Sequence, residues 1–597
     1  MRYPLAAISA ASVCISLANA QDVTELEEII LSANQSETEA SRTGATVEVV
    51  TQEELEQRGD MRVADYLNTL PGISVGTNGG PGTQTSLRIR GLSDRYIPVL
   101  IDGIDVTDPS QQQIQFNFGS LMTSDISRIE VLKGSQSALY GSDAIGGVIS
   151  ITTNRATEEG TVVSLDLEAG SYETYRGSLN ISTLTERGEL AFTYSRVTTD
   201  GFSAADENDG NDEEDGHSAS QISFSAAHNL TDTVRIGLSG FYLKSETEFD
   251  ASGPQDGAHP FNEISSSEQS GIRTFAEIQG REIDHTVSLS YFENDRLIKG
   301  DFPDFDPVGQ RSSVSYKGYT DISSNLGLSF GGDWTREGGE DVRDQEIGGL
   351  FSEVTYAPSA DLDLAFSLRH DEHSNFGGFL SARAAVAYQI NDDMTLRAIA
   401  ANGFRAPSPQ ELYGPFGAND DLDPEESRTF EVGLERRFGA GSFVKGTLFY
   451  TEIDELIQFD NGYVQVDGTS RTRGLELSAE HALNDNLQIF GAYTFTDARN
   501  PSDERQIRVP ENDLVIGLNA SFADRWTGQI SAQHVANLED GVDLRDYTVV
   551  NGQIGYDFND NAQVYLRVEN IADQEYQTIR GYGQSDRAFY VGLRTSF

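Results

Sequence analysis

The chain has 597 residues, with 95 acidic and 42 basic side chains, so its formal net charge is −53. A chain this acidic repels a phosphate backbone, which argues against nucleic acid as a partner. The 58 Gly, 30 Phe and 23 Tyr residues suit a β protein with many turns and argue against a mainly disordered chain.

Residues 1–20 have the pattern of a secretory signal peptide. Arg2 precedes an apolar stretch, and Ala-Asn-Ala at 18–20 forms the small-x-small cleavage pattern. Cys14, the single cysteine of the sequence, lies within this segment. A lipoprotein site at Cys14 is the alternative, but Val13 stands where such a site needs a small residue. We therefore expect an exported chain without a mature cysteine, which excludes a thiolate nucleophile or a zinc–thiolate site.

Residues 21–45 are acidic and are expected to form a flexible leader, interrupted by an apolar run at 29–31. Residues 46–153 then mix helix and strand patterns. Thr51 followed by Glu54 is typical of a helix N-cap box, and a second short helix, 63–70, ends at Pro-Gly. Strands are expected at 47–50, 87–89, 99–101, 129–131 and 148–151. The segment is long enough for a core of its own.

From 154 to 597 the sequence alternates between apolar and polar residues. In 361–369 every even position is Leu or Phe, and every odd position is Asp, Ala, Ser or Arg. Residues 234–239 and 564–569 alternate in the same way. One apolar and one polar face are typical either of a sandwich strand or of a transmembrane barrel strand.

The turns favour the transmembrane barrel. Short polar turns recur at 229–232, 391–393, 484–486, 522–524 and 559–561. Consecutive turns are separated by roughly 35 to 40 residues, enough for two strands and one long polar loop. The segment therefore holds about 22 strands, a number typical of plugged outer-membrane transporters rather than open porins. The chain ends on an alternating segment that closes with Phe597, as expected for a final barrel strand.

Several motifs in 46–153 resemble the plug of TonB-dependent outer-membrane receptors. They lie at 67–73, 88–91, 99–103, 129–134 and, most specifically, at 137–148 (Ser-Ala-Leu-Tyr-Gly-Ser-Asp-Ala-Ile-Gly-Gly-Val). The last motif is similar in form to the BtuB-type, cobalamin-transporting branch of that family. Residues 404–407 and 422–427 resemble the mid-barrel motif, and 569–576 resemble the penultimate strand. The resemblance implies a mainly β fold: a 22-stranded transmembrane antiparallel β-barrel over 154–597, occluded by an N-terminal α/β plug domain over 46–153.

The resemblance implies active transport, which needs energy. The sequence has no phosphate-binding Gly-x-x-x-x-Gly-Lys motif, so we expect a partner to supply that energy. A segment of the leader, 27–33, resembles the TonB box, through which TonB and its inner-membrane complex drive transport. It consists of Glu27, Glu28, Ile29, Ile30, Leu31, Ser32 and Ala33. A short apolar segment of this kind is suited to adding as a strand to a sheet of the partner. The alternative is a stray apolar run in a disordered leader.

Two plug loops, 76–82 and 105–115, face the outside in the family to which the resemblance points. They provide candidate ligand contacts: Asn78, Gln84, Ser86, Gln111, Gln112 and Gln113. Amide side chains both donate and accept hydrogen bonds, which suits a neutral, amide-rich ligand. The alternative is that they are solvated loop residues.

An acidic loop at 200–215 carries so many carboxylates that they repel one another unless a hard cation such as calcium binds. The cobalamin transporters bind calcium in the corresponding loops, which implies a site formed by Asn211, Glu213, Asp215, Asp250 and Asp256. Two departures weaken this expectation: Phe249 replaces a tyrosine, and Lys244 falls where an aspartate is expected and could substitute for one cation. A solvated acidic loop is the alternative.

Other metal or catalytic sites are not expected. His370 and His373 lie on one predicted strand but on opposite faces, so they should not share a metal ion. The sequence contains neither a Gly-x-Ser-x-Gly nor a His-Glu-x-x-His motif. We therefore do not expect an enzyme.

The expected function is TonB-dependent import of cobalamin (vitamin B12) or a related corrinoid into the periplasm, by a monomer surrounded by outer-membrane lipid. A siderophore or haem receptor of the same superfamily is the alternative, and a passive porin-like barrel is the alternative from another class. Against the first alternative, residues 404–427 contain no histidine, and basic residues that could bind an anionic iron chelate are few in this acidic chain. A porin would need neither a plug nor a TonB box.

Overall fold

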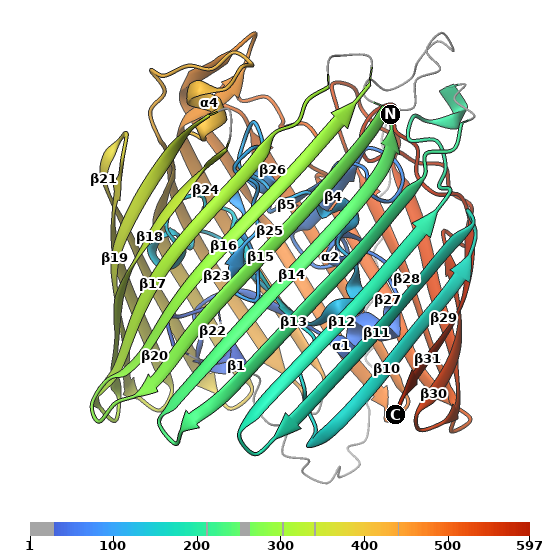
Figure 1. Ribbon diagram of the computed structural model, residues 1–597, viewed down its shortest axis with the longest axis horizontal. Coiled ribbons are helices and arrows are strands. Elements are labelled where there is room, and N and C mark those ends of the chain that lie inside the picture. Colours follow the sequence, from blue (N-terminus) through green and yellow to red (C-terminus); the bar gives the residue numbers. More distant parts are fainter. Residues whose placement is uncertain are drawn as a thin grey trace, which may run out of the picture.

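The computed structural model describes residues 29–30, 32–36, 38–209, 213–250, 263–300, 304–339, 342–439 and 441–597. These residues form a closed β-barrel with a smaller α/β domain inside it (Figure 1). In the described part of the chain, no helix is both long and apolar enough to cross a membrane.

The inner domain is the plug, whose strands and helices run from Val47 to Thr153. Its five-stranded sheet has the order β3-β8-β9-β6-β7, with β6 and β9 parallel and the other pairs antiparallel, and β4 and β5 form a separate hairpin. The strands are β3 (Val47–Thr51), β4 (Ile73–Thr77), β5 (Thr85–Ile89), β6 (Val99–Ile101), β7 (Ile104–Asp105), β8 (Ile126–Lys133) and β9 (Gly147–Thr153). The helices are α1 (Gln52–Arg58), α2 (Val63–Leu67) and α3 (Ser137–Tyr140).

Local sequence signals account for the plug elements. Thr51 and Glu54 form the predicted capping box of α1, and Gly59 ends this helix with φ of +72°. The core is apolar and closely packed, with Val50, Leu67 and Ile149 fully buried. The second predicted helix is shorter than expected, because α2 ends at Leu67 and the chain turns before Pro71.

Within the described residues, 22 strands close the barrel, as predicted, and every neighbouring pair is antiparallel. The first eleven are β10 (Gly160–Gly170), β11 (Thr174–Thr185), β12 (Gly188–Thr199), β13 (His217–Thr231), β14 (Val234–Phe249), β15 (Glu263–Gln279), β16 (Asp284–Lys299), β17 (Val308–Ser323), β18 (Leu326–Gly339), β19 (Val342–Ser359) and β20 (Leu362–His373). The others are β21 (Gly377–Asn391), β22 (Met394–Arg405), β23 (Glu425–Arg437), β24 (Phe443–Phe459), β25 (Tyr463–Asn484), β26 (Leu487–Arg499), β27 (Asn512–Phe522), β28 (Trp526–Ala536), β29 (Tyr547–Asn559), β30 (Ala562–Glu569) and β31 (Ala588–Ser596). A further helix, α4 (Pro409–Tyr413), lies in the loop between β22 and β23.

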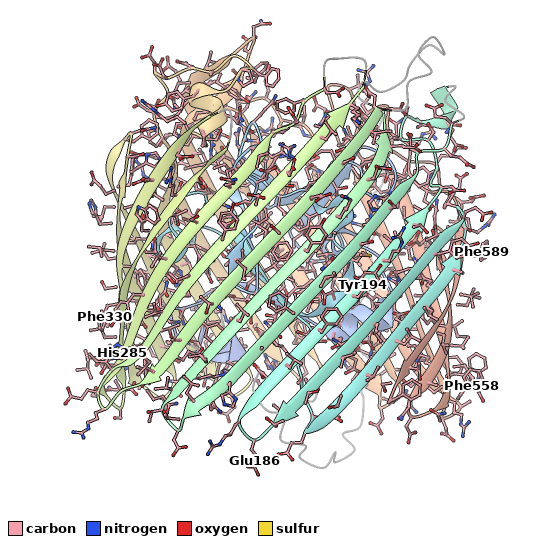
Figure 2. All side chains as sticks on the ribbon, viewed as in Figure 1. Glu186, Tyr194, His285, Phe330, Phe558 and Phe589 are labelled. Atoms are coloured by element: carbon pink, nitrogen blue, oxygen red, sulfur yellow. The ribbon has the colours of Figure 1, made fainter. Side chains whose placement is uncertain are left out.

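The barrel wall has its apolar side chains on the outside. On β20, Phe366 is 51% exposed on the outer face, whereas Ser367 and Arg369 are buried on the inner face. Figure 2 shows Tyr194 and Phe589 on the outer wall and Glu186 at a short turn. This arrangement is opposite to that of a soluble sandwich and suits a wall surrounded by lipid.

Strand β31 closes the barrel by pairing with β10, from Ser164 opposite Ser596 to Gly170 opposite Tyr590. Phe597 extends this ladder, since its N–H donates to the carbonyl of Val163 at 2.9 Å and its carbonyl accepts from the N–H of Val163 at 3.0 Å. The C-terminal residue therefore contributes to closure through its backbone.

Candidate ligand-binding site

A cavity of about 830 Å³ lies between the plug and the barrel loops, at the end opposite the short turns. Asn78, Gln84 and Ser86 line it from the β4–β5 hairpin, whose loop is closed by a hydrogen bond from the N–H of Asn78 to the carbonyl of Gln84 at 3.1 Å. Gln113 lines it from the loop after β7. The opposite wall includes Gln458 and Ser470 of the barrel. Uncharged donors and acceptors therefore face one another across a cavity large enough for a sizeable ligand.

Four of the six candidate ligand contacts thus meet at one cavity, and two do not. Gln111 and Gln112 belong to the same loop as Gln113 but do not line the cavity. The carbonyl of Gln112 instead accepts from the hydroxyl of Ser408 at 2.9 Å, and the amide of Gln113 donates to Glu411 of α4 at 3.1 Å. This loop is therefore attached to the segment that follows β22.

Charged side chains also line the cavity, and the sequence analysis missed them. They are Arg88, Arg95, Arg505 and Arg508, together with Asp94, Glu504 and Glu539. Arg508 is paired with Asp540 at 3.0 Å, whereas Arg88 has no ion-pair partner within 4.0 Å among the described residues. The expectation that basic groups are too few to bind an anion is therefore wrong for this cavity, because the net charge of the chain says nothing about where individual arginines lie.

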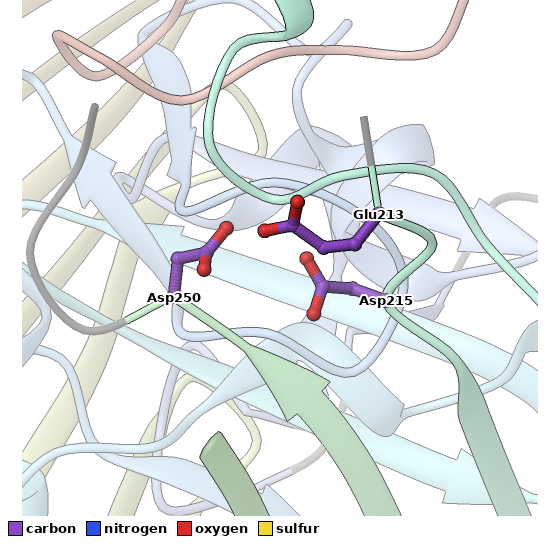
Figure 3. Close-up of side chains that lie close together, drawn as sticks. All are labelled: Glu213, Asp215 and Asp250. Carbon is purple, nitrogen blue, oxygen red and sulfur yellow. The ribbon is translucent and has the colours of Figure 1, made fainter. Parts of the chain in front are cut away.

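Three carboxylates of the acidic loops come together on the same side of the molecule. Oxygens of Glu213, Asp215 and Asp250 lie within 4.8 Å of one another (Figure 3). Asp215 accepts a hydrogen bond from the N–H of Ala204 at 2.6 Å, and Asp250 accepts one from the N–H of Ala205 at 2.8 Å. The backbone therefore fixes two of the three groups.

Burial, together with the negative charges of Asp250 and Glu213, raises the pKa of Asp215 to about 7, against the opposing effect of the Ala204 hydrogen bond. Burial also raises the pKa of Asp250. A hard divalent cation would replace this repulsion by attraction, so the donor set fits calcium.

The other residues of the expected calcium site have different outcomes. Asn211 and Asp256 lie outside the described residues. Lys244 does not face the three carboxylates: its side chain is 60% exposed on the outer wall, where it pairs with Glu268. The expectation that Lys244 could replace a cation is therefore wrong, because side chains alternate along β14 and Lys244 lies on the outer face. Phe249 ends β14, directly before Asp250.

Part of the expected TonB box is folded at the short-turn end. Ile29–Ile30 forms β1, which pairs with β2 (Thr38–Glu39), while Glu27, Glu28 and Leu31 lie outside the described residues. Ile30 is 1% exposed and packs with Leu132 and Val148 of the plug and with Ala385 and Ile399 of the wall.

Polar contacts hold the same segment. The carboxylate of Glu130 accepts from the N–H of Ser32 at 3.0 Å and from its hydroxyl, and the hydroxyl of Tyr140 donates to the carbonyl of Ser32 at 2.9 Å. Arg128 donates to the carbonyl of Ile29 at 2.7 Å. Ala33 is fully buried. The described part of the leader is therefore attached to β8 and α3 of the plug, whereas the sequence suggested a free segment.

The mid-barrel motif forms a buried ion-pair network. Arg405, at the end of β22, pairs with Glu425 at 2.6 Å and with Glu411 of α4 at 2.9 Å. All three side chains are 2% exposed or less. Removal of one partner would leave a buried charge unpaired, which is strongly unfavourable. The network therefore fixes the loop after β22, which contacts Gln112 and Gln113.

The two histidines of β20 lie on opposite faces, as predicted. His370 is exposed on the outer wall, whereas His373 is buried and lies 3.2 Å from the side-chain oxygen of Gln345. They do not form a shared metal site.

The family models identify the chain. Residues 39–148 match the TonB-dependent receptor plug domain, and residues 160–571 match the TonB-dependent receptor-like β-barrel. The chain belongs to the TonB-dependent receptors. This family consists of receptors and transporters rather than enzymes. Its members are β-barrels of the Gram-negative outer membrane, and this protein is one of them.

Curated relatives and solved structures match this TonB-dependent receptor over nearly its whole length. The vitamin B12 transporter BtuB of Photobacterium profundum is 27% identical and covers 100% of both chains. The BtuB of Vibrio cholerae is 24% identical over 98% of this chain and 97% of its own. The siderophore receptor PirA of Acinetobacter baumannii superimposes with a TM-score of 0.79 at 17% identity, over 92% of this chain and 98% of its own. The ferripyoverdine receptor of Pseudomonas aeruginosa superimposes with a TM-score of 0.81 at 16% identity, over 96% of this chain and 89% of its own. The solved structures support the fold alone.

Proposed function

We propose that this receptor imports cobalamin or a related corrinoid, in a cycle driven by TonB. The observation that carries the proposal is full-length similarity to proteins named vitamin B12 transporters, at 24–27% identity. The cavity at the outer end supports it, since Asn78, Gln84 and Gln113 offer amide donors and acceptors to the amide groups around a corrin ring.

The arginines of the cavity refine this proposal. Cobalamin carries one phosphodiester in its nucleotide loop, and cobinamide lacks it. Arg88, which has no ion-pair partner among the described residues, is the side chain that we assign to this phosphate. The same arginines also favour an anionic iron chelate as a second candidate ligand, because a charge-assisted hydrogen bond does not distinguish between these anions.

A binding titration of the purified receptor separates the candidates. The ligands are cyanocobalamin, dicyanocobinamide, haem and a ferric catecholate siderophore. We expect cyanocobalamin to bind most tightly, and Arg88→Met to weaken it by about tenfold or more while leaving dicyanocobinamide nearly unchanged. Arg196→Met, at an exposed position on the outer wall, is the matched control. Binding of the iron chelate alone would overturn the substrate assignment.

Calcium is part of the proposal as a structural ion of the outer loops. Glu213, Asp215 and Asp250 would hold it, and its positive charge would fix these three carboxylates to one another. Fixing the segments that carry them lowers the entropic cost of ligand capture, so ligand affinity should rise with calcium.

Uptake then requires release of the leader from the plug. Since Ile30 is buried and Ser32 is hydrogen-bonded, a partner can add to this segment as a strand only after these contacts break. The TonB box assignment therefore predicts two states of the segment, docked and released. Deletion of residues 21–41 should abolish energised uptake, whereas uptake through a passive barrel would persist.

A further inference from the structure

The barrel wall is open between two neighbouring strands. β21 and β22 pair from Asn391 opposite Met394 up to Arg383 opposite Ala401, and no further. Beyond that point β21 still pairs with β20 as far as Gly377, and β22 still pairs with β23 as far as Arg405. Within the described residues, 377–382 and 402–405 are therefore strands with a ladder partner on one side only.

The plug accounts for this separation, because it replaces β21 as a partner of β22. The hydroxyl of Ser135 donates to the carbonyl of Asn402 at 3.3 Å, and the N–H of Asp143 donates to the carbonyl of Phe404 at 3.1 Å. A Cβ added to Gly403 would lie 2.4 Å from the hydroxyl of Ser137, so a side chain at this position would have to displace groups of the plug. The motif at 137–148 and the motif at 404–407 therefore meet here.

The lower end of the opening is closed by one side chain. The amide oxygen of Asn402 accepts from the N–H of Ala382 at 2.8 Å, and its amide nitrogen donates to the carbonyl of Leu380 at 2.9 Å. These are backbone groups that a continued ladder would have paired. Because a bilayer offers no water to such groups, an amide at this position lets the two strands diverge at a low energetic cost.

A groove of about 880 Å³ lies at this opening, and we call it the β21–β22 groove. Its outer lining is apolar: Phe366, Leu368, Leu380 and Phe430 are 48–58% exposed. The ring of Phe404 stacks on that of Phe379, with centroids 4.5 Å apart, and both rings line the groove. Arg383, Glu426 and Arg428 also line the groove, so charged groups of both signs lie beside its apolar residues.

We propose that the β21–β22 groove binds an acyl chain of an outer-leaflet lipid. The groove lies in the half of the wall away from the short turns, which is the outer-leaflet half of a barrel of this kind. Its apolar residues continue the lipid-facing surface of β20 and β23, so the groove is part of an interface that the membrane already covers. Its volume lies within the range of sites that enclose small organic ligands. A bound chain fills the space that the missing ladder leaves and seals the wall.

Photocrosslinking in the membrane tests this proposal on the full-length receptor. The receptor is reconstituted into nanodiscs of phosphatidylethanolamine with a diazirine on one acyl chain, irradiated, digested and analysed by mass spectrometry. Adducts on 377–382 and 426–430 are compared with adducts on a reference surface of the same wall, formed by Leu514, Ile516 and Ile530, which are 39–54% exposed. A chain in the groove contacts protein on both sides, whereas a chain on the open wall contacts it on one side only, so dispersion contacts should give more adducts at the groove than at the reference surface.

Two variants distinguish the groove from general lipid contact. Ala382→Trp and Ala400→Trp place bulky rings at two exposed lining positions, and should reduce groove adducts to the level of the reference surface. Ala532→Trp, on β28, is the matched control and should leave groove adducts unchanged. Heat-modifiable mobility on gels verifies that each barrel is folded. Equal adduct yields at the groove and the reference surface would overturn the proposal.

Discussion

Tyr140→Phe should loosen the docked leader without changing the shape of the plug. The variant removes one hydroxyl, which donates to the carbonyl of Ser32 at 2.9 Å, and keeps the ring. A neutral hydrogen bond of this kind contributes about 1 kcal/mol net, so the ratio of released to docked leader should rise roughly fivefold. If TonB binds only the released segment and the docked state predominates, its apparent Kd should fall by the same factor.

The assay is calorimetric titration of the ligand-free receptor with the purified C-terminal domain of TonB. Limited proteolysis within 29–36 gives a second measure of release that does not depend on the partner. Tyr66→Phe is the matched control, since Tyr66 is also a buried plug tyrosine and its ring contact with Arg58 would remain. If the TonB affinity and the proteolysis rate of Tyr140→Phe both equalled those of wild type, the docked contacts would not control access of TonB to the leader. If TonB affinity fell, Tyr140 would contact the partner itself.

Four further outcomes follow from the site, the leader and the barrel. Asp215→Asn with Asp250→Asn should abolish any effect of calcium on ligand affinity, measured with calcium and with a chelator, whereas Lys244→Ala should leave it intact; an unchanged response in the double variant would remove the carboxylates from the calcium site. Because the pKa of Asp215 is raised to about 7, the uncomplexed loops should lose stability as the pH rises through 7 and this carboxyl ionises, while calcium affinity should rise over the same range, roughly tenfold between about pH 6 and pH 8. Deletion of Phe597 removes two backbone hydrogen bonds to Val163 and should lower the amount of assembled barrel, scored on gels, with normal uptake per inserted molecule. Ile30→Pro should retain ligand binding and abolish energised uptake, since proline cannot donate to a partner strand; lost binding would assign Ile30 to the fold instead.

The sequence predicted the architecture well because strand periodicity is a local signal. Leu and Phe at the even positions of 361–369 predicted the outer face of β20, and the structure has Phe366 and Leu368 exposed there. Thr51 with Glu54 predicted a helix start that needs no tertiary contact. The number of strands followed from turn spacing, which a closed antiparallel barrel preserves along the chain.

Long-range contacts were beyond such reasoning. The pairing of Arg405 with Glu425 joins the two mid-barrel motifs through a buried network, and the sequence does not show that these charged residues are buried. The docking of Ser32 on Glu130 joins residues 98 apart. The opening between β21 and β22 could not be predicted from the alternation pattern, because both strands continue to pair with their other neighbours and keep the two-residue alternation after they separate.

The same limit applies to the ligand. A net charge of −53 suggested a cavity hostile to anions, yet the plug and the loops bring four arginines and three carboxylates to its lining. Net charge governs the long-range field, whereas affinity depends on groups within hydrogen-bonding reach. Arg88 is attracted by Asp94 but forms no ion pair within 4.0 Å among the described residues. The two candidate ligands therefore differ in the anionic group that Arg88 would bind, which is a phosphodiester in the corrinoid and part of the chelate in the iron complex. Comparison of cobalamin with cobinamide in Arg88→Met tests this assignment, because the two ligands share the corrin ring and cobinamide lacks the nucleotide loop that carries the phosphate.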